Sequence, residues 1–164
     1  MKEFNYTGTC IPTQHYMVNT KSKLDKIIRL INRNKYFTIN LPRQFGKTTS
    51  IYLLKETLKS KYLVFSTSFE GLGESFFNEE QEFCSSIIPL LTEGFISDDK
   101  DFFNQLKSIA KENKTFIKLS NTISDICKGT EKKIILFIDE VDKASNYKLF
   151  FEFFGNATKQ IFAK

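Results

Sequence analysis

The sequence predicts an α/β fold built around a mostly parallel sheet. Three segments have the composition of strands: residues 36–40, 62–69 and 134–138. Helical patterns of apolar residues separate them along the chain. Strands and helices that alternate in this way form parallel sheets, because each helix carries the chain back to the edge at which the next strand begins.

The first helix is expected to run from Thr20 or Ser22, either of which can cap it, to about Arg33. Its apolar residues follow the three-four spacing of one buried face: Leu24, Ile27, Ile28 and Ile31. Residues 36–40 are aromatic and β-branched and lead to Pro42, which predicts a strand that runs into a loop. A second helix follows that loop, with an apolar stripe at Ile51, Leu54 and Leu58.

The second strand, residues 62–69, is closed by a glycine turn at residues 71–73. The pattern is mostly helical from residue 76 to about residue 91 and from residue 101 to about residue 127. Pro89 and the polar residues 97–99 are expected to interrupt it.

The clearest strand is residues 134–138, a continuous apolar run. Such a run is typical of a parallel strand that helices cover on both faces.

The composition is that of a soluble globular protein. The chain of 164 residues is 26% charged and 41% hydrophobic, and it has no apolar run of about eighteen residues that could cross a membrane. Its length suits one domain. The N-terminus carries an early acid and lacks the apolar segment of a secretory signal, so a cytoplasmic location is expected.

Neither cysteine nor histidine chemistry is indicated. Cys10, Cys84 and Cys127 lie far apart without the paired spacing of a zinc site, so we expect reduced, buried thiols. His15 is the sole histidine, and no acid-base partner lies near it in the sequence. A structural or peripheral role is expected for it.

The net charge of +5 and the pI near 9.0 raise the question of a nucleic-acid partner. The lysines, however, are dispersed among acids, and the only arginines are Arg29, Arg33 and Arg43. Dispersed surface charge is therefore favoured over a nucleic-acid-binding face.

The segment between the first predicted strand and the second helix matches the latter part of the phosphate loop G-x-x-x-x-G-K-[ST]. Gly46 allows close approach of the backbone, whose N–H groups at a helix N-terminus can hold phosphates. Lys47 is expected to reach the β and γ phosphates of ATP, Thr48 to bind Mg²⁺, and Thr49 to contact the α-phosphate. Leu41 departs from the motif, because it stands at the position of the first glycine.

Two adjacent carboxylates, Asp139 and Glu140, follow the clearest strand. The carboxyl ends of strands are where open α/β sheets bind ligands. We expect Asp139 to hold Mg²⁺ through its water shell and Glu140 to act as the catalytic residue, on the water that attacks the γ-phosphate. Taken alone, the pair could also be a solvated acidic turn. For Asp142, a supporting role beside the metal and no role are left open.

The chain resembles the bacterial AAA-like ATPase domains related to the STAND and NACHT switch ATPases. The segments that carry the resemblance are residues 7–12, 15–18, 42–49 and 138–142, and the last two are the specific ones. The resemblance implies a P-loop NTPase fold, a three-layer sandwich with a mostly parallel sheet.

By the same resemblance, residues outside the G-K-T-T core of the loop contact the nucleotide: Pro42, Arg43, Gln44, Phe45, Tyr16 and Val18. Tyr16 and Val18, with Met17 between them, would lie near the adenine. An ordinary packed N-terminal strand accounts for these residues almost as well.

Domains of this family continue into a strand with a polar sensor residue, a further strand and a helical lid. After Asp142 the sequence offers only one helical stretch, residues 149–154, and it has no arginine after Arg43 that could serve as an arginine finger. A truncation before the sensor strand and lid is therefore expected. The implied parts are an N-terminal segment and helix (1–35), a nucleotide-binding core (36–142) and an incomplete helical end (143–164).

These features predict ATP binding with Mg²⁺ as cofactor, and Mg²⁺-dependent ATP hydrolysis in a full-length parent. Whether the chain is an enzyme by itself stays open. The alternatives are a nucleotide-gated interaction module with little turnover and a non-functional remnant of a longer ATPase. ATP is the expected ligand; self-association or a protein partner is expected to involve regions beyond this chain.

Overall fold

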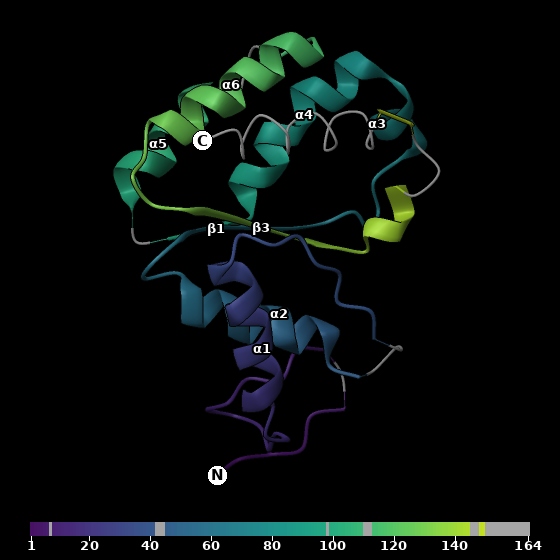
Figure 1. Ribbon diagram of the computed structural model, residues 1–164. Helices are drawn as coiled ribbons and strands as arrows, with labels where there is room; N and C mark the ends of the chain where they lie inside the picture. The colour runs from purple at the N-terminus through teal and green to yellow at the C-terminus, as the bar shows by residue number, and fades with distance from the viewer. Residues whose placement is uncertain (7, 42–44, 98, 110–112, 145–147, 150–164) are drawn as a thin grey trace. The chain divides into compact units, whose positions relative to one another are not determined.

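The structure is a computed structural model, which describes residues 1–6, 8–41, 45–97, 99–109, 113–144 and 148–149 (Figure 1). The chain divides into two compact units, Met1–Lys59 and Ser60–Lys164. Among the described residues, no helix combines the length and apolar character that a bilayer crossing requires.

The first unit contains an N-terminal segment and two helices, α1 (Lys21–Asn32) and α2 (Lys47–Leu58). Both helices were predicted, and both bury part of the predicted apolar face: Ile27 and Ile31 on α1, Leu54 and Leu58 on α2. The expected side-chain cap at Thr20 is wrong, because Thr20 makes no side-chain cap hydrogen bond to α1; its carbonyl oxygen accepts the Lys23 and Leu24 N–H groups.

The N-terminal segment folds back on itself. Glu3 and His15 form an isolated parallel bridge, in which the Glu3 carbonyl accepts the Tyr16 N–H at 2.9 Å. His15 Nδ1 accepts the Ile11 N–H at 2.9 Å. This hydrogen bond is a structural contact, in keeping with the structural or peripheral role expected for His15.

The predicted strand at residues 36–40 is not formed. The structure assigns no regular element to these residues, and Tyr36 is 66% exposed. A short β-branched run becomes a strand only where a neighbouring strand pairs with its backbone. In the described part of the first unit, the single strand-like pairing is the Glu3–His15 bridge.

The second unit is built on a sheet with the strand order β2-β1-β3. Strands β1 (Leu63–Ser68) and β3 (Ile134–Asp139) were both predicted, and they pair in parallel from Leu63↔Ile134 to Ser68↔Asp139. The short strand β2 (Phe95–Ile96) adds an antiparallel edge. The α/β class is confirmed, and the described sheet is small and mixed.

In the part of the second unit that the structure describes, the sheet is accompanied by α3 (Glu74–Asn78), α4 (Glu80–Glu93), α5 (Lys100–Ile109), α6 (Phe116–Lys128) and the short 3₁₀ helix η1 (Val141–Ala144). In Figure 1, α3 to α6 all lie on one side of β1 and β3. The helical stretch predicted at residues 149–154 lies outside the described residues from residue 150 onward.

Pro89 does not interrupt its helix, contrary to the prediction. It lies inside α4, which continues to Glu93. A proline removes one backbone hydrogen bond, but the neighbouring side chains of Ile87, Ile88 and Thr92 are buried. Their burial offsets the lost bond, and the break in helical structure falls instead at Glu79, whose backbone is extended.

The core of the second unit lies between the sheet and these helices. Alternate residues of both strands face it, Leu63 and Phe65 from β1 and Ile134, Leu136 and Ile138 from β3. Five buried phenylalanines fill it from the helices and loops: Phe69, Phe76, Phe77, Phe83 and Phe102. Within β3 itself only Phe137 is buried, so the full coverage expected of this strand is not reached.

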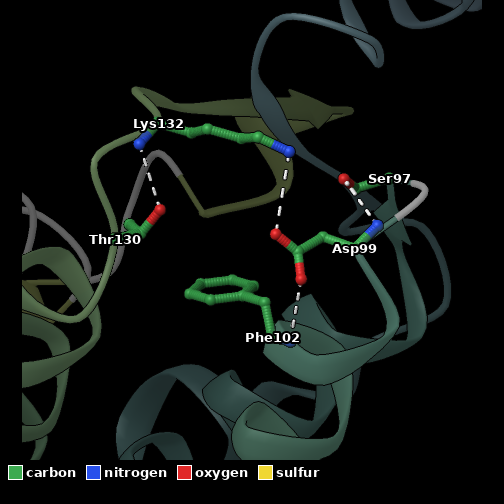
Figure 2. Close-up of polar contacts among 5 residues, drawn as sticks. All are labelled: Ser97, Asp99, Phe102, Thr130 and Lys132. Atoms are coloured by element: carbon green, nitrogen blue, oxygen red, sulfur yellow. Dashed lines mark hydrogen bonds and ion pairs between the residues drawn. The ribbon is translucent and has the colours of Figure 1, made fainter.

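Asp99, one of the polar residues expected to interrupt the helical pattern, stands directly before α5 (Figure 2). Asp99 Oδ1 accepts the Phe102 N–H at 3.0 Å, which satisfies one donor of the first helical turn. Asp99 Oδ2 lies 3.7 Å from Lys132 Nζ in the segment before β3. One carboxylate therefore joins the start of α5 to the approach to β3.

Candidate functional site

The first group of candidate residues, in the first unit, lies at the start of α2. Gly46 stands directly before the helix, with φ +74 and ψ 30, a left-handed conformation. A Cβ at this position would meet no atom within 4 Å, so conformation rather than space favours glycine here. The first intrahelical bond follows at once, from the Ser50 N–H to the Gly46 carbonyl at 2.8 Å.

The first turn of α2 has the electrostatic character of an anion site. Its N–H groups have no carbonyl acceptor within the helix, and the aligned peptide dipoles place partial positive charge there. No acidic residue stands in this turn, and its first residue is Lys47, which is half-buried. Thr48 is exposed, so its hydroxyl is open to solvent.

The structure gives Thr49 a contact that the sequence did not suggest. Its Oγ1 accepts the Cys10 N–H at 3.1 Å, which ties the N-terminal segment to the start of α2. The hydroxyl keeps its own proton for donation, so this contact is compatible with the predicted phosphate role.

Three other residues predicted to contact nucleotide have exposed side chains. Phe45 is 68% exposed, Tyr16 is 53% exposed and Val18 is 84% exposed. Tyr16 also pairs with Phe4, with ring centroids 5.0 Å apart. The side chains of Tyr16 and Val18 are therefore largely accessible to solvent. The predicted contacts at Pro42, Arg43 and Gln44 lie outside the described residues.

A buried polar chain behind the loop was missed by the sequence analysis. Ser50 is 1% exposed, and its Oγ donates to the Gly46 carbonyl at 2.7 Å. The same Oγ accepts from Lys23 Nζ of α1 at 3.2 Å. The sequence offers one weak sign of this polar chain, because Ser50 directly follows the G-K-T-T motif. It offers no sign that Lys23 takes part.

The second group of candidate residues, in the second unit, lies at the end of β3. Asp139 is the last residue of the strand, opposite Ser68 of β1, and its carbonyl accepts the Phe69 N–H at 3.1 Å. Its Oδ1 accepts the Glu140 N–H at 3.0 Å. Asp139 and Glu140 are both half-buried, while Asp142 in η1 is exposed.

Glu140 has an unusual backbone. Its φ is +52, in the left-handed region that non-glycine residues rarely adopt. Its carbonyl then accepts the Lys143 N–H at 3.1 Å, so the chain turns directly from β3 into η1. Such strain is concentrated at functional sites, and nothing in the sequence indicated it here.

The sequence predicts two metal ligands, Thr48 and Asp139. Thr48 belongs to the first unit and Asp139 to the second. Among the described residues, no three His, Cys, Asp or Glu side chains gather as metal ligands. A hydroxyl and one carboxylate acting through water do not require such a cluster.

The burial expected of the three thiols is found for one of them. Cys84 is fully buried, while Cys10 and Cys127 are half-buried. Burial, and secondarily the charge of Glu80, raises the pKa of the Cys84 thiol to about 11. At neutral pH Cys84 is therefore an inert packing residue.

Comparisons of the chain with protein-family models, with curated proteins and with solved structures found no match.

Proposed function

We propose that this chain binds Mg-ATP. The observation that carries the proposal is the start of α2, where the left-handed Gly46 leads directly into Lys47 and Thr48 in a turn without acidic residues. The sequence motif and the local backbone conformation therefore both favour phosphate binding at this turn. The triphosphate would lie against this turn, with Lys47 on the β and γ phosphates and Thr48 on Mg²⁺.

Electrostatics supports a strongly charged ligand at this turn. A lysine in the first turn of a helix faces the positive end of the dipole, which is unfavourable in a protein without a bound anion. Binding of a polyphosphate reverses the sign of that interaction. The half-buried position of Lys47 strengthens the contact, since partial exclusion of water reduces screening.

In the same proposal, the carboxylates after β3 supply the metal and water chemistry. Asp139 would hold Mg²⁺ through water, and Glu140 would orient or deprotonate the attacking water. The support is the position of the pair at the carboxyl end of a parallel strand. Hydrolysis is proposed for a full-length parent. Binding without turnover in such a parent would instead favour a nucleotide-gated interaction module.

Calorimetric titration of the chain with Mg-ATP tests the proposal. Lys47→Ala should weaken binding at least tenfold, because a charge-assisted phosphate contact contributes roughly 1.5–3 kcal/mol. Lys55→Ala is the matched control, since Lys55 is also half-buried and lies in the last turn of the same helix. Equal affinities for wild type and a folded Lys47→Ala variant, or an equal loss in Lys55→Ala, would remove the phosphate-loop assignment.

A further inference from the structure

The Gly46 carbonyl is held twice by one residue. It accepts the Ser50 N–H at 2.8 Å and the Ser50 Oγ at 2.7 Å. The first bond is the ordinary helical one, and the second is additional. With Ser50 only 1% exposed, water does not compete effectively for either bond.

Holding this carbonyl also fixes the direction of the next N–H. The peptide unit that joins Gly46 to Lys47 is planar, and in a trans peptide the C=O and N–H point in opposite directions. The Gly46 oxygen points along α2 toward Ser50. The Lys47 N–H is therefore directed out of the helix N-terminus, toward the position proposed for phosphate.

Lys23 determines which way the Ser50 hydroxyl points. An ammonium group can only donate hydrogen bonds, so Ser50 Oγ must be the acceptor in its 3.2 Å contact with Lys23 Nζ. The single hydroxyl proton is then directed to the Gly46 carbonyl. The two hydrogen bonds therefore run in one direction: Lys23 donates to Ser50, and Ser50 donates to Gly46.

We propose that Ser50 and Lys23 are positioning residues for the phosphate loop. They hold the Gly46–Lys47 peptide in the orientation that presents the Lys47 N–H to a bound phosphate, without touching the nucleotide themselves. This inference rests on the proposed Mg-ATP function and adds the side chains that prepare the loop for it.

Titration with Mg-ATP provides the first test. Ser50→Ala should weaken binding roughly three- to tenfold, the ratio that corresponds to one neutral hydrogen bond. Thr57→Val is the matched control, because the Thr57 hydroxyl makes the same bond to the carbonyl four residues earlier, at 2.8 Å, on an exposed part of α2. It should leave the affinity within about twofold.

A double-mutant cycle tests whether Lys23 acts through Ser50. Lys23→Met should weaken binding in the wild type but have no additional effect in Ser50→Ala. A merely structural bond would move stability and leave affinity unchanged in both variants. An equal loss in both backgrounds would mean that Lys23 attracts the phosphates directly, which would overturn the proposal.

The outcomes separate this inference from the function on which it rests. If wild type does not bind Mg-ATP, both fail. If wild type binds and Lys47→Ala does not, but Ser50→Ala behaves like Thr57→Val, the positioning role alone is wrong. Should Ser50→Ala fail to fold, Lys23→Met is followed by the amide NMR signal of Lys47. That signal should shift in Lys23→Met and not in the control Lys26→Met on the exposed side of α1.

Discussion

Because the backbone at Glu140 is left-handed, the protein should be more stable with glycine at this position than with alanine. Both substitutions remove the carboxylate, so the comparison isolates the backbone. A left-handed conformation costs an L-residue roughly 1–2 kcal/mol, and glycine avoids this cost. Glycine loses about 0.5–1 kcal/mol more in conformational entropy on folding. Glu140→Gly should therefore equal Glu140→Ala in stability or exceed it by up to about 1.5 kcal/mol.

The matched control is Lys143, which is exposed in η1 and has no positive φ. There alanine should be the more stable by about 0.5–1 kcal/mol, because only the entropy difference operates. Subtracting the two comparisons cancels that difference and leaves the strain, roughly 1–2 kcal/mol. In a chain of this size, 1 kcal/mol corresponds to about 2–4 °C in Tm.

Urea unfolding followed by circular dichroism measures all four variants. The preference should reverse between the two positions, with unchanged slopes against urea. The same glycine preference at both positions, or the same alanine preference, would show that Glu140 is not strained. A confirmed reversal would mean that the fold maintains a costly conformation at the residue proposed to act on water.

Further predictions concern the carboxylates, a helix cap and a buried thiol. In a full-length parent that hydrolyses ATP, Glu140→Gln should retain nucleotide binding and lose phosphate release. Parental turnover in this variant would exclude Glu140 as the base. Asp139→Asn should instead raise the Mg²⁺ concentration needed for nucleotide binding. Asp99→Ala should lower the free energy of unfolding, measured with urea, by about 0.5–2 kcal/mol through loss of the α5 cap. The control Asp125→Ala removes an exposed ion pair with Lys128 and should change the free energy of unfolding by less than about 0.5 kcal/mol. Equal effects of the two substitutions would contradict the capping role of Asp99. The raised pKa of Cys84, about 11 against an ordinary 9.0, means that the folded state keeps its proton longer than the unfolded state. Stability should therefore fall as pH rises from about 9 to 11, and the advantage of wild type over Cys84→Ala should shrink over that window; a constant difference would contradict the shift.

The sequence was sufficient where a single element carried its own signal. Strands β1 and β3 are continuous β-rich runs, and α1 and α2 have regular apolar faces, so each was predicted from its own residues. The start of α2 was also predicted, because Gly46 and Lys47 belong to a motif that encodes its conformation.

Elements that depend on partners distant in the sequence were not predictable in this way. Strand β2 has two residues and exists because it pairs with β1. Beside it, a Cβ at Gly94 would lie 1.8 Å from the Ser66 carbonyl oxygen, a closeness that no local pattern reveals. Conversely, residues 36–40 have the composition of a strand but no strand is formed there.

The candidate site divides along the same line. Candidate residues at positions 46–49 and 139–140 could be proposed from the sequence, because few residue types suit the binding of phosphate and metal. The supports were not, since the contact between Lys23 and Ser50 joins residues of two different helices. The positive φ of Glu140 likewise depends on how β3 turns into η1.

The parallel pairing of β1 with β3 has a consequence for the order of folding. Leu63 and Ile134 are partners, yet α3, α4, α5 and α6 all lie between them in the chain. Closing so long a loop is entropically costly before any strand contact compensates for it, whereas each helix forms from neighbouring residues. The helices are therefore expected to form early in refolding, and the β1–β3 pair late. The edge where Asp139 ends its strand would then be among the last parts of the second unit to take shape.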